Sequence, residues 1–451
     1  MLHLGIGDFI PSLLYFGGIV VFLLSVIWKP QIGLYFVVPL LPWQTARYRL
    51  HGMPLGEQFV DIIYLGIALG LLLHRKDEWV PKTPLNRIIV IFLIFYYVSL
   101  FRGSFYISAP FPLSISDPRF SDYKNYMEMM ILFLLVVAAI RDVRQIKILI
   151  GCMALSFLIV NRSFYNYMSD RDLMHFSPLL RDAGPLGYAG DNGLAAFEAQ
   201  FGLLLLGLYS IEKRLLIKLS FLCVIATAMY CLLFSFSRGG YLGFLAGLVF
   251  MGIYRERKLL LIVLALILSW QAVVPNAVRE RILMTYDEGS GLDSSAEERV
   301  SLWQDALHVF DHDPFFGTGY DTYKFMGRVG PYRDTHNMYV KVLVETGIFG
   351  MGLFLWLLWK MYRLGIELYR KSEDAFLRSL GLGFGALMVC AVTVNIFGDR
   401  WTYVQVNGYL WAVLGCVVRG LLIAHRGTYM AEEGVGPSPE LVNCPPQESA
   451  A

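Results

Sequence analysis

Apolar residues in this chain come in blocks of about 15–20, separated by short polar gaps, and no other feature constrains the fold as strongly. A helix needs about 20 predominantly apolar residues to cross the hydrocarbon core of a bilayer. The second block contains Pro39 and Pro42 and is short, so the predicted count is 12 or 13 helices. Blocks that reach or approach the required length run at 10–28, 31–43, 59–74, 86–101, 123–140, 145–161, 193–210, 215–235, 240–254, 258–274, 338–359, 377–397 and 403–424.

Composition agrees with a membrane protein. Of the 451 residues, 56% are hydrophobic and 16% are charged, whereas a soluble domain carries about 25% charged residues. The net charge of +2 is too small to indicate a nucleic-acid partner. The six cysteines show no metal-ligand spacing, and those inside apolar blocks are interpreted as small packing residues. The chain is therefore predicted to be an all-α polytopic membrane protein.

Lysine and arginine crowd alternate gaps, and this asymmetry predicts how the helices are oriented, because short cytoplasmic loops carry an excess of these residues. The gaps at about 44–58, 102–122, 162–192, 235–239, 275–337 and 398–402 are then expected to face outward. With 13 helices the N-terminus is also outside, and a mistaken first hairpin would reverse it. The basic gaps hold Arg75, Lys76, Lys82 and Arg87; Arg141, Arg144 and Lys147; Lys213, Arg214 and Lys218; Arg255, Arg257 and Lys258; and Lys360, Arg363, Arg370, Lys371 and Arg378.

This layout divides the chain into four parts. Residues 1–274 hold about ten helices, 275–337 form a large outer loop, and 338–426 hold about three helices. Residues 427–451 are rich in proline and acidic residues and are predicted to be a disordered cytoplasmic tail. A gap as long as 275–337 is expected to have structure and function of its own.

The long outer loop contains the pattern of a helix. Ser294 and Ser295 each stand three residues before a glutamate, as in a capping box. Arg299 lies one turn before Trp303, on the same side of this helix. We expect its apolar face to rest on the membrane domain. That face is predicted to consist of Val300, Trp303, Leu307 and Phe310.

The loop ends in Asp334-Thr335-His336-Asn337, directly where the next membrane block begins. His336 is therefore expected at a membrane boundary, where Thr335 and Asn337 could orient its ring. Histidine can act as a general base near neutral pH. The alternative interpretation is a hydrogen-bonded histidine with only an interfacial role.

Arg238 stands in Ser237-Arg238-Gly239-Gly240, between two apolar blocks with almost no room for a loop. The guanidinium group is thus expected at the membrane edge, where a charge usually faces a cavity or a partner. Guanidinium binds phosphate oxygens in a bidentate manner, and the glycines allow a ligand to approach the backbone closely. The alternative is an arginine that reaches toward lipid phosphate.

Two further arginines are weaker candidates. Arg181 lies in the 162–192 gap, which carries as many acidic as basic residues and is interpreted as a solvated loop. Arg400 belongs to Asp399-Arg400-Trp401, which is interpreted as a paired interfacial charge beside an aromatic anchor. Asn337 and Tyr339, next to His336, complete the candidate set.

Three segments of the sequence resemble the O-antigen ligase and polymerase family of bacterial envelope proteins. They are Ser237-Arg238-Gly239-Gly240, the stretch from Arg299 to Gly319, and Thr335–Tyr339 followed by Glu345–Gly350. The motif likeness covers about 235–352, and only the span pattern is similar before it. Family members usually have histidine directly before the proline of the loop motif. Here Asp313 intervenes, so His312 is assigned no role.

The resemblance implies a GT-C-like membrane glycosyltransferase with its site at the periplasmic face of the bacterial inner membrane. Its donor would be an undecaprenyl-diphosphate-linked glycan, and its acceptor a glycan, lipid A-core or a protein. Arg238 and Arg299 would bind the donor diphosphate, and His336 would activate the acceptor hydroxyl. Transfer would be inverting and independent of metal ions and cofactors. The sequence does not separate ligase, polymerase and protein-glycosylating activities.

The alternative function is a transporter or flippase for a lipid-linked or anionic solute. A transporter is expected to place ionisable residues near the middle of the membrane, on helices that are broken in matching halves. Here the conspicuous polar residues cluster at one face, which favours an enzyme.

Overall fold

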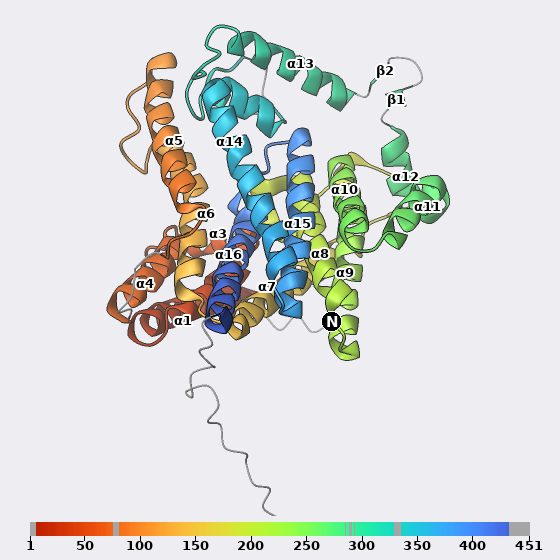
Figure 1. Ribbon diagram of the computed structural model, residues 1–451. Helices are drawn as coiled ribbons and strands as arrows, with labels where there is room; N and C mark the ends of the chain where they lie inside the picture. Colours follow the sequence, from red (N-terminus) through yellow and green to blue (C-terminus); the bar gives the residue numbers. More distant parts are fainter. Residues whose placement is uncertain are drawn as a thin grey trace, which may run out of the picture.

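The computed structural model describes residues 6–74, 81–284, 286–287, 291–292, 294–328 and 335–432, and it shows an all-α polytopic bundle (Figure 1). Asp334 and most of the expected tail, 433–451, lie outside these residues. The helices of the first part are α1 (Ile6–Ile27), α2 (Gln31–Leu40), α3 (Gln44–Tyr48), α4 (Phe59–His74), α5 (Asn86–Tyr106), α6 (Pro118–Ala139), α7 (Val143–Met168), α8 (Gly190–Ile211), α9 (Leu215–Phe234), α10 (Arg238–Tyr254) and α11 (Lys258–Val273). They are followed by α12 (Asn276–Leu283), α13 (Ser294–Phe310), α14 (Met338–Lys371), α15 (Ala375–Val394) and α16 (Val404–Glu432).

Each apolar block found in the sequence coincides with a helix. By length and composition, eight helices in the described part of the chain can cross a membrane, or nine if the bent pair α11–α12 is one span. α2 and α4 are apolar but shorter, and α10 has 17 residues. The all-α membrane fold is therefore confirmed, while the count of 12 or 13 crossing helices stays a prediction.

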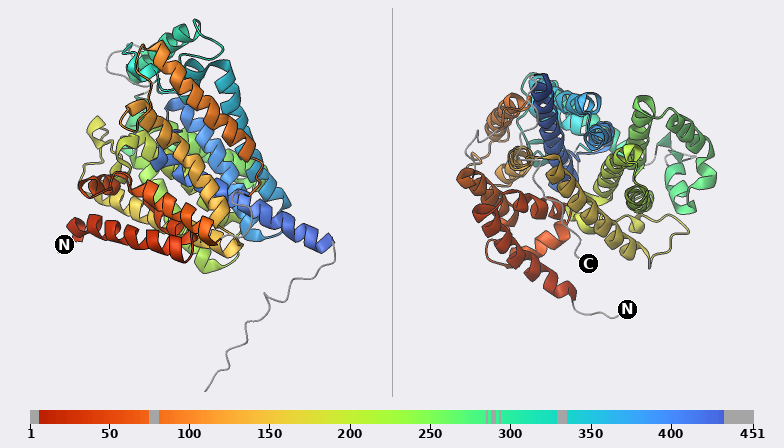
Figure 2. Two further views of the ribbon diagram at one scale, coloured as in Figure 1. Left: turned by 90° about the vertical axis from the view of Figure 1, so that its left-hand side faces the viewer. Right: turned by 60° about the horizontal axis from the view of Figure 1, so that its bottom comes forward.

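The centre of the bundle is formed by α8, α15 and α16, and the amino-terminal helices lie around it. The apolar stretches 404–424, 184–211 and 375–397 are 89%, 78% and 72% buried, against 11% for α1. Figures 1 and 2 place the amino-terminal helices (red) and the α11–α12 pair (green) on opposite sides of this centre. The long loop with α13 covers one end, and α16 leads away at the other.

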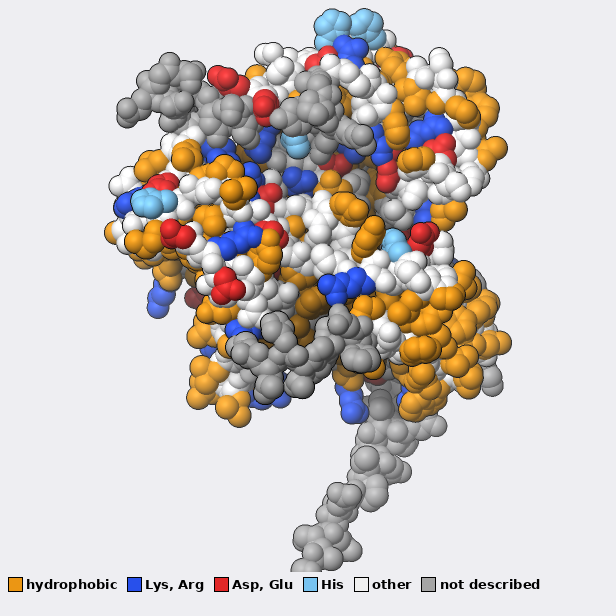
Figure 3. All heavy atoms as spheres, turned by 180° about the vertical axis from the view of Figure 1, so that it is seen from behind, with side chains coloured by type: hydrophobic (Ala, Val, Ile, Leu, Met, Phe, Trp, Pro, Cys, Tyr) orange, Lys and Arg blue, Asp and Glu red, His pale blue; other side chains and the backbone are white. Residues whose placement is uncertain are grey.

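Seen from behind, charged side chains gather over the upper half of the molecule, and hydrophobic side chains form much of the surface below (Figure 3). Apolar residues are also exposed on α1 and α11, among them Leu13 at 68% and Leu268 at 78%, as expected of a lipid-facing bundle. The polar end is the one that carries α13.

The outer loop contains the predicted helix, α13, which packs on α14. The predicted apolar face was partly wrong, because Val300 and Leu307 are 39% and 43% exposed. The buried face is instead Leu302, Ala306 and Val309, which pack near Tyr323 and Val344. A helix one position out of register turns its face by about 100°. Before α13, two short strands, β1 (Tyr286–Asp287) and β2 (Gly291–Leu292), pair in antiparallel fashion.

The segment after α13 anchors the loop to the membrane helices. Gly317 and Gly319 both have positive φ, and the amides of Thr318 and Gly319 donate to the carbonyls of Val344 and Glu345 on α14. An added Cβ at Gly319 would lie 2.2 Å from Gly103 on α5. The glycine turn noted in the sequence is thus required by close contact with two helices. Short 3₁₀ turns complete the fold: η1 (Arg49–Gly52), η2 (Pro178–Leu180), η3 (Gly184–Ala189), η4 (Tyr323–Phe325) and η5 (Asn395–Phe397).

Glycines let α8 and α15 touch at the backbone. A Cβ at Gly207 would lie 2.3 Å from the Cα of Gly383, and a Cβ at Gly383 would lie 2.6 Å from the carbonyl oxygen of Leu204. Small residues at such crossings are typical of packed membrane helices. This contact fixes α15, whose outer end carries part of the candidate site described below.

We expect Gly383→Ala to lower the stability of the folded protein by roughly 1–3 kcal/mol, because the added methyl must push two backbones apart. Thermal unfolding of the detergent-solubilised protein measures this. Gly352→Ala on α14 is the matched control, since nothing lies within 4 Å of its added Cβ. Equal melting temperatures for the two variants would contradict the close α8–α15 packing.

Candidate functional site

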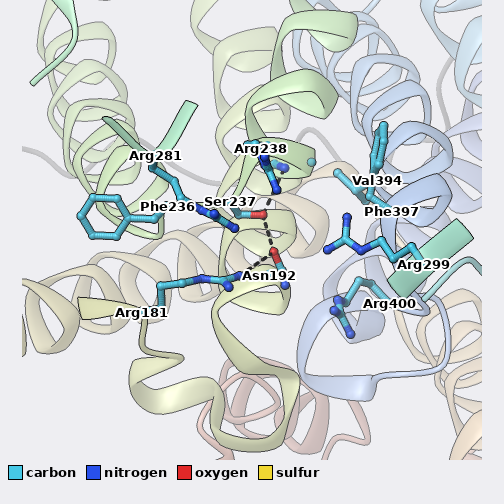
Figure 4. Close-up of a pocket in the computed structure, with 12 residues that line it drawn as sticks. Arg181, Asn192, Phe236, Ser237, Arg238, Arg281, Arg299, Val394, Phe397 and Arg400 are labelled. Atoms are coloured by element: carbon cyan, nitrogen blue, oxygen red, sulfur yellow. Dashed lines mark hydrogen bonds between the residues drawn. The ribbon is translucent and has the colours of Figure 1, made fainter. Parts of the chain in front are cut away.

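Five arginines from five separate segments line one pocket at the polar end of the bundle (Figure 4). The pocket has an empty volume of about 390 Å³, part of which is open to solvent. No acidic side chain lines it among the described residues. It contains the two principal and the two weaker arginine candidates, together with one that the sequence did not single out. They are Arg181, Arg238, Arg281, Arg299 and Arg400.

Arg238 is the first residue of α10, and its position follows from a very tight turn. α9 ends at Phe234, and the buried Phe236 takes a positive φ of 55°. Ser237 caps α10: its hydroxyl accepts from the amide of Gly240 and donates to the side-chain oxygen of Asn192 at 2.7 Å. The first backbone amides of a helix attract an anion. The half-buried Arg238 and the start of α10 therefore favour an anion in the same part of the pocket.

Arg181 reaches the pocket from the loop before η3. It forms an ion pair with Asp191, and it also donates to Asn192 at 3.4 Å. Asn192 thus accepts from both Ser237 and Arg181, and this links α8 to the start of α10. The 162–192 gap therefore contributes one arginine to the pocket, where the sequence alone indicated a solvated loop.

Arg299 lies on α13 and is half-buried. Figure 4 shows it on the same side of the pocket as Arg400, with Arg181 and Arg281 on the other side. Arg238 and Arg299, to which the family resemblance gives one diphosphate, line the same pocket, and their binding role stays a prediction.

Arg281 was missed by the sequence reasoning, which named no candidate between 275 and 293. α12 turns back by 106° from α11 after Pro275, and this bend returns Arg281 to the bundle. Its guanidinium group lies 5.2 Å from the ring centre of Phe176. The only signal in the sequence was the Val-Pro break followed by a short charged segment.

α12 is held to the loop before η2 through Glu280. Its carboxylate accepts from the backbone amide of Phe176 at 2.7 Å and pairs with His175 at 2.9 Å. The amide of Phe176, followed by His175, holds the pKa of Glu280 below its ordinary value. The loop that carries Arg181 and the helix that carries Arg281 are thus joined to each other.

The interpretation of Asp399-Arg400-Trp401 as a paired charge with an interfacial anchor was wrong. Asp399 pairs with Lys341 of α14 at 2.7 Å, and no carboxylate of the described residues pairs with Arg400. Trp401 is 1% exposed and donates to the hydroxyl of Tyr126 at 2.8 Å, so it is a core residue. Asp399 and Arg400 are adjacent in sequence, but the turn between η5 and α16 directs their side chains apart. Adjacency therefore did not predict which residue Asp399 pairs with.

His336 lies outside the lining of the arginine pocket, immediately before α14. It is half-buried and has a positive φ of 50°, which is uncommon for a residue other than glycine. Asn337 caps α14 by accepting from the amides of Tyr339 and Val340 at 2.9 and 3.2 Å. The backbone at His336 is therefore fixed from its C-terminal side.

A second contact joins His336 to the helix of Arg299. Trp303, one turn after Arg299 on α13, donates its indole N–H to the carbonyl oxygen of Thr335 at 2.9 Å. Thr335 also donates its hydroxyl to the carbonyl oxygen of Asn337 at 2.9 Å. Their contacts with backbone groups give Thr335 and Asn337 a structural role, and orientation of the ring of His336 by them stays a prediction.

Tyr339 lines a groove that is separate from the arginine pocket. It lines an apolar groove between α14 and α15, with an empty volume of about 890 Å³. Its hydroxyl donates to the carbonyl oxygen of Val392 at 2.8 Å, which fastens the start of α14 to the outer end of α15. Tyr339 is therefore not brought to the arginine pocket.

A known protein family matches part of the chain. Residues 221–355 match the family described as O-antigen ligase, and this stretch includes Arg238, Arg281, Arg299 and His336. Arg181 and Arg400 lie outside the matched residues. A search of curated proteins finds no match. Residues 221–355 are therefore similar to the O-antigen ligase family, which confirms the family resemblance carried by the sequence motifs.

Proposed function

We propose that the protein is a membrane glycosyltransferase that takes a glycan from an undecaprenyl-diphosphate-linked donor and transfers it to an acceptor hydroxyl at the periplasmic face. The observation that carries the proposal is the pocket at the polar end of the bundle, where the two family-motif arginines meet three more. The family match supports glycan transfer in general. The identity of the donor, the membrane face and the transfer mechanism are part of this proposal.

The arginine pocket suits a diphosphate. Guanidinium groups form bidentate, charge-assisted hydrogen bonds with phosphate oxygens, and the start of α10 adds backbone amides. When the bond from the anomeric carbon to the diphosphate breaks, negative charge builds on the leaving oxygen. Positioned cations stabilise that charge most where it develops. We assign this role to Arg238 and Arg299, in place of a divalent metal ion.

His336 is the proposed general base. Its imidazole takes the proton of the acceptor hydroxyl while that oxygen bonds to the anomeric carbon. The bond to the lipid diphosphate breaks on the opposite side of the carbon, so the configuration is inverted. The proton ends on His336 and the electron pair on the diphosphate. Because α13 carries Arg299 and contacts the residue before His336, the loop aligns the base with the anion site.

The place of the site favours transfer chemistry over transport. The five arginines line a pocket at the end of the bundle that carries α13. A solute carrier needs its binding groups near the middle of the bilayer, between the two gates. The acceptor class, whether a glycan, lipid A-core or a protein, stays open in this proposal.

We expect His336→Ala to lower the transfer rate by about 10²–10⁴-fold while binding of the donor is kept, because only proton removal is lost. The measurement is transfer from a lipid-diphosphate-linked glycan by purified protein in nanodiscs. His312→Ala is the matched control, since that histidine is exposed at the end of α13. A wild-type rate for His336→Ala would sink the assignment of the base.

Arg238→Ala is expected to abolish detectable transfer, and Arg238→Lys to retain a small part of it, because lysine keeps the charge but not the bidentate geometry. Both variants are expected to fold and insert. Arg214→Ala is the control, since this arginine lies between α8 and α9 with its side chain 70% exposed. If Arg238→Lys matches the wild type, bidentate binding of phosphate at this position is contradicted.

The transporter alternative has its own test. Wild-type protein in liposomes is expected to leave a fluorescent lipid-diphosphate-linked glycan in the leaflet where it was placed when no acceptor is present. Leaflet exchange is measured by quenching with a reagent that does not cross the bilayer. Movement of the donor faster than in protein-free liposomes would favour the flippase.

A further inference from the structure

We propose that Arg400 is a further donor-binding residue, and that the ion pair between Lys341 and Asp399 positions it by keeping its neighbouring carboxylate away. The inference rests on the proposed function, because it takes the donor diphosphate as the ligand of the pocket. It adds a phosphate contact outside the residues that match the family.

Among the described residues, Arg400 is a buried cation that no carboxylate pairs with. It is 9% exposed, lines the pocket, and has no carboxylate partner among the described residues. Within the described part of the chain, its Nε has no hydrogen-bond partner, and its Nη1 reaches only the carbonyl oxygen of Asp399, at 3.4 Å. The ring of Tyr403 lies 5.7 Å from the guanidinium carbon. Burial of an uncompensated charge is costly, so a ligand anion is the expected partner.

The one carboxylate close to Arg400 in sequence is occupied elsewhere. Asp399, whose side chain is 3% exposed, pairs with Lys341 at 2.7 Å. It also accepts from the hydroxyl of Thr402, with its two oxygens at 3.2 and 3.3 Å. These contacts keep Asp399 from neutralising the adjacent guanidinium.

The backbone around Arg400 is fixed so that the guanidinium can face the pocket. Its amide donates to Asn395 at 2.9 Å, and its carbonyl accepts from Asn407 at 2.6 Å. An added Cβ at Gly398 would lie 3.0 Å from Nη2 of Arg400, so the guanidinium folds back over this glycine. Figure 4 shows the side chain on the same side of the pocket as Arg299.

Lys341 connects this arrangement to the proposed base. It lies on α14, within the first turns after His336, and its pair with Asp399 joins the start of α14 to the turn that carries Arg400. Removing the lysine charge would leave a buried carboxylate beside Arg400. Asp399 is then expected to turn toward the guanidinium and compete with the donor phosphates.

The test compares Arg400→Gln, Lys341→Met and the double variant Lys341→Met/Asp399→Asn in donor titrations of the nanodisc protein. Losing a charge-assisted contact should raise the KM for donor by roughly 10- to 100-fold in Arg400→Gln. Lys341→Met should raise KM by about 10-fold with little change in kcat, and the double variant should return to within about 3-fold of wild type. Lys371→Met, which removes the partly exposed Lys371–Glu367 pair within α14, is the control.

Binding of inorganic diphosphate to the same proteins separates this inference from the proposed function. Weaker binding in Arg400→Gln supports the phosphate contact even if the wild type transfers no glycan, a result that would sink only the proposed function. Wild-type affinity in Arg400→Gln would overturn the role of Arg400. A double variant as impaired as Lys341→Met would overturn the positioning role of the pair, and thermal unfolding shows whether either variant has merely lost its fold.

Discussion

Guanidinium groups that share one pocket repel one another, and the remainder of the structure has to hold them in place against that repulsion. Five of them line the pocket at the polar end of this bundle, and they come from the loop before η3, α10, α12, α13 and the turn before α16. Segments of such different origin cannot be brought together by local sequence. The packing of the helices beneath them must therefore supply the rigidity that the site requires.

The close contact between α8 and α15 is the part of that packing nearest the site. Gly207 and Gly383 bring the two backbones together, and Gly240 and Gly243 at the start of α10 face Ala195 and Val394 in the same way. α8 carries Asn192 in its first turn, α10 begins at Arg238, and α15 leads into the turn of Arg400. Helices that touch at glycines have little freedom to separate, so the spacing of the charges at their outer ends is set by steric contact.

Structural features that depend on local sequence pattern could be predicted from the sequence. Apolar blocks located the membrane helices, and Arg238 was recognisable because almost no loop separates its two flanking blocks. Arg281 was not recognisable, since only the 106° bend between α11 and α12 brings it to the pocket. The partner of Asp399 was not recognisable either, because its carboxylate pairs with a lysine 58 positions earlier in the chain. Periodicity and charge place a residue at one end of a helix, but they do not say which long-range contact it makes.

The placement of His336 outside the arginine pocket bears on how such a site would work. A base must reach the acceptor hydroxyl on the face of the anomeric carbon opposite the leaving diphosphate, so base and anion site have to be separate but held at a constant spacing. In the proposed mechanism α13 has that role: it carries Arg299 at the pocket and, one turn later, Trp303 hydrogen-bonded to the residue before His336. The Lys341–Asp399 pair makes a second connection, from the first turns of α14 to Arg400. The segment of His336 and the arginine pocket are thus joined by two independent connections. Together these connections restrict both the rotation and the separation of the two regions. This is why the long outer loop needs a packed helix rather than a flexible crossing.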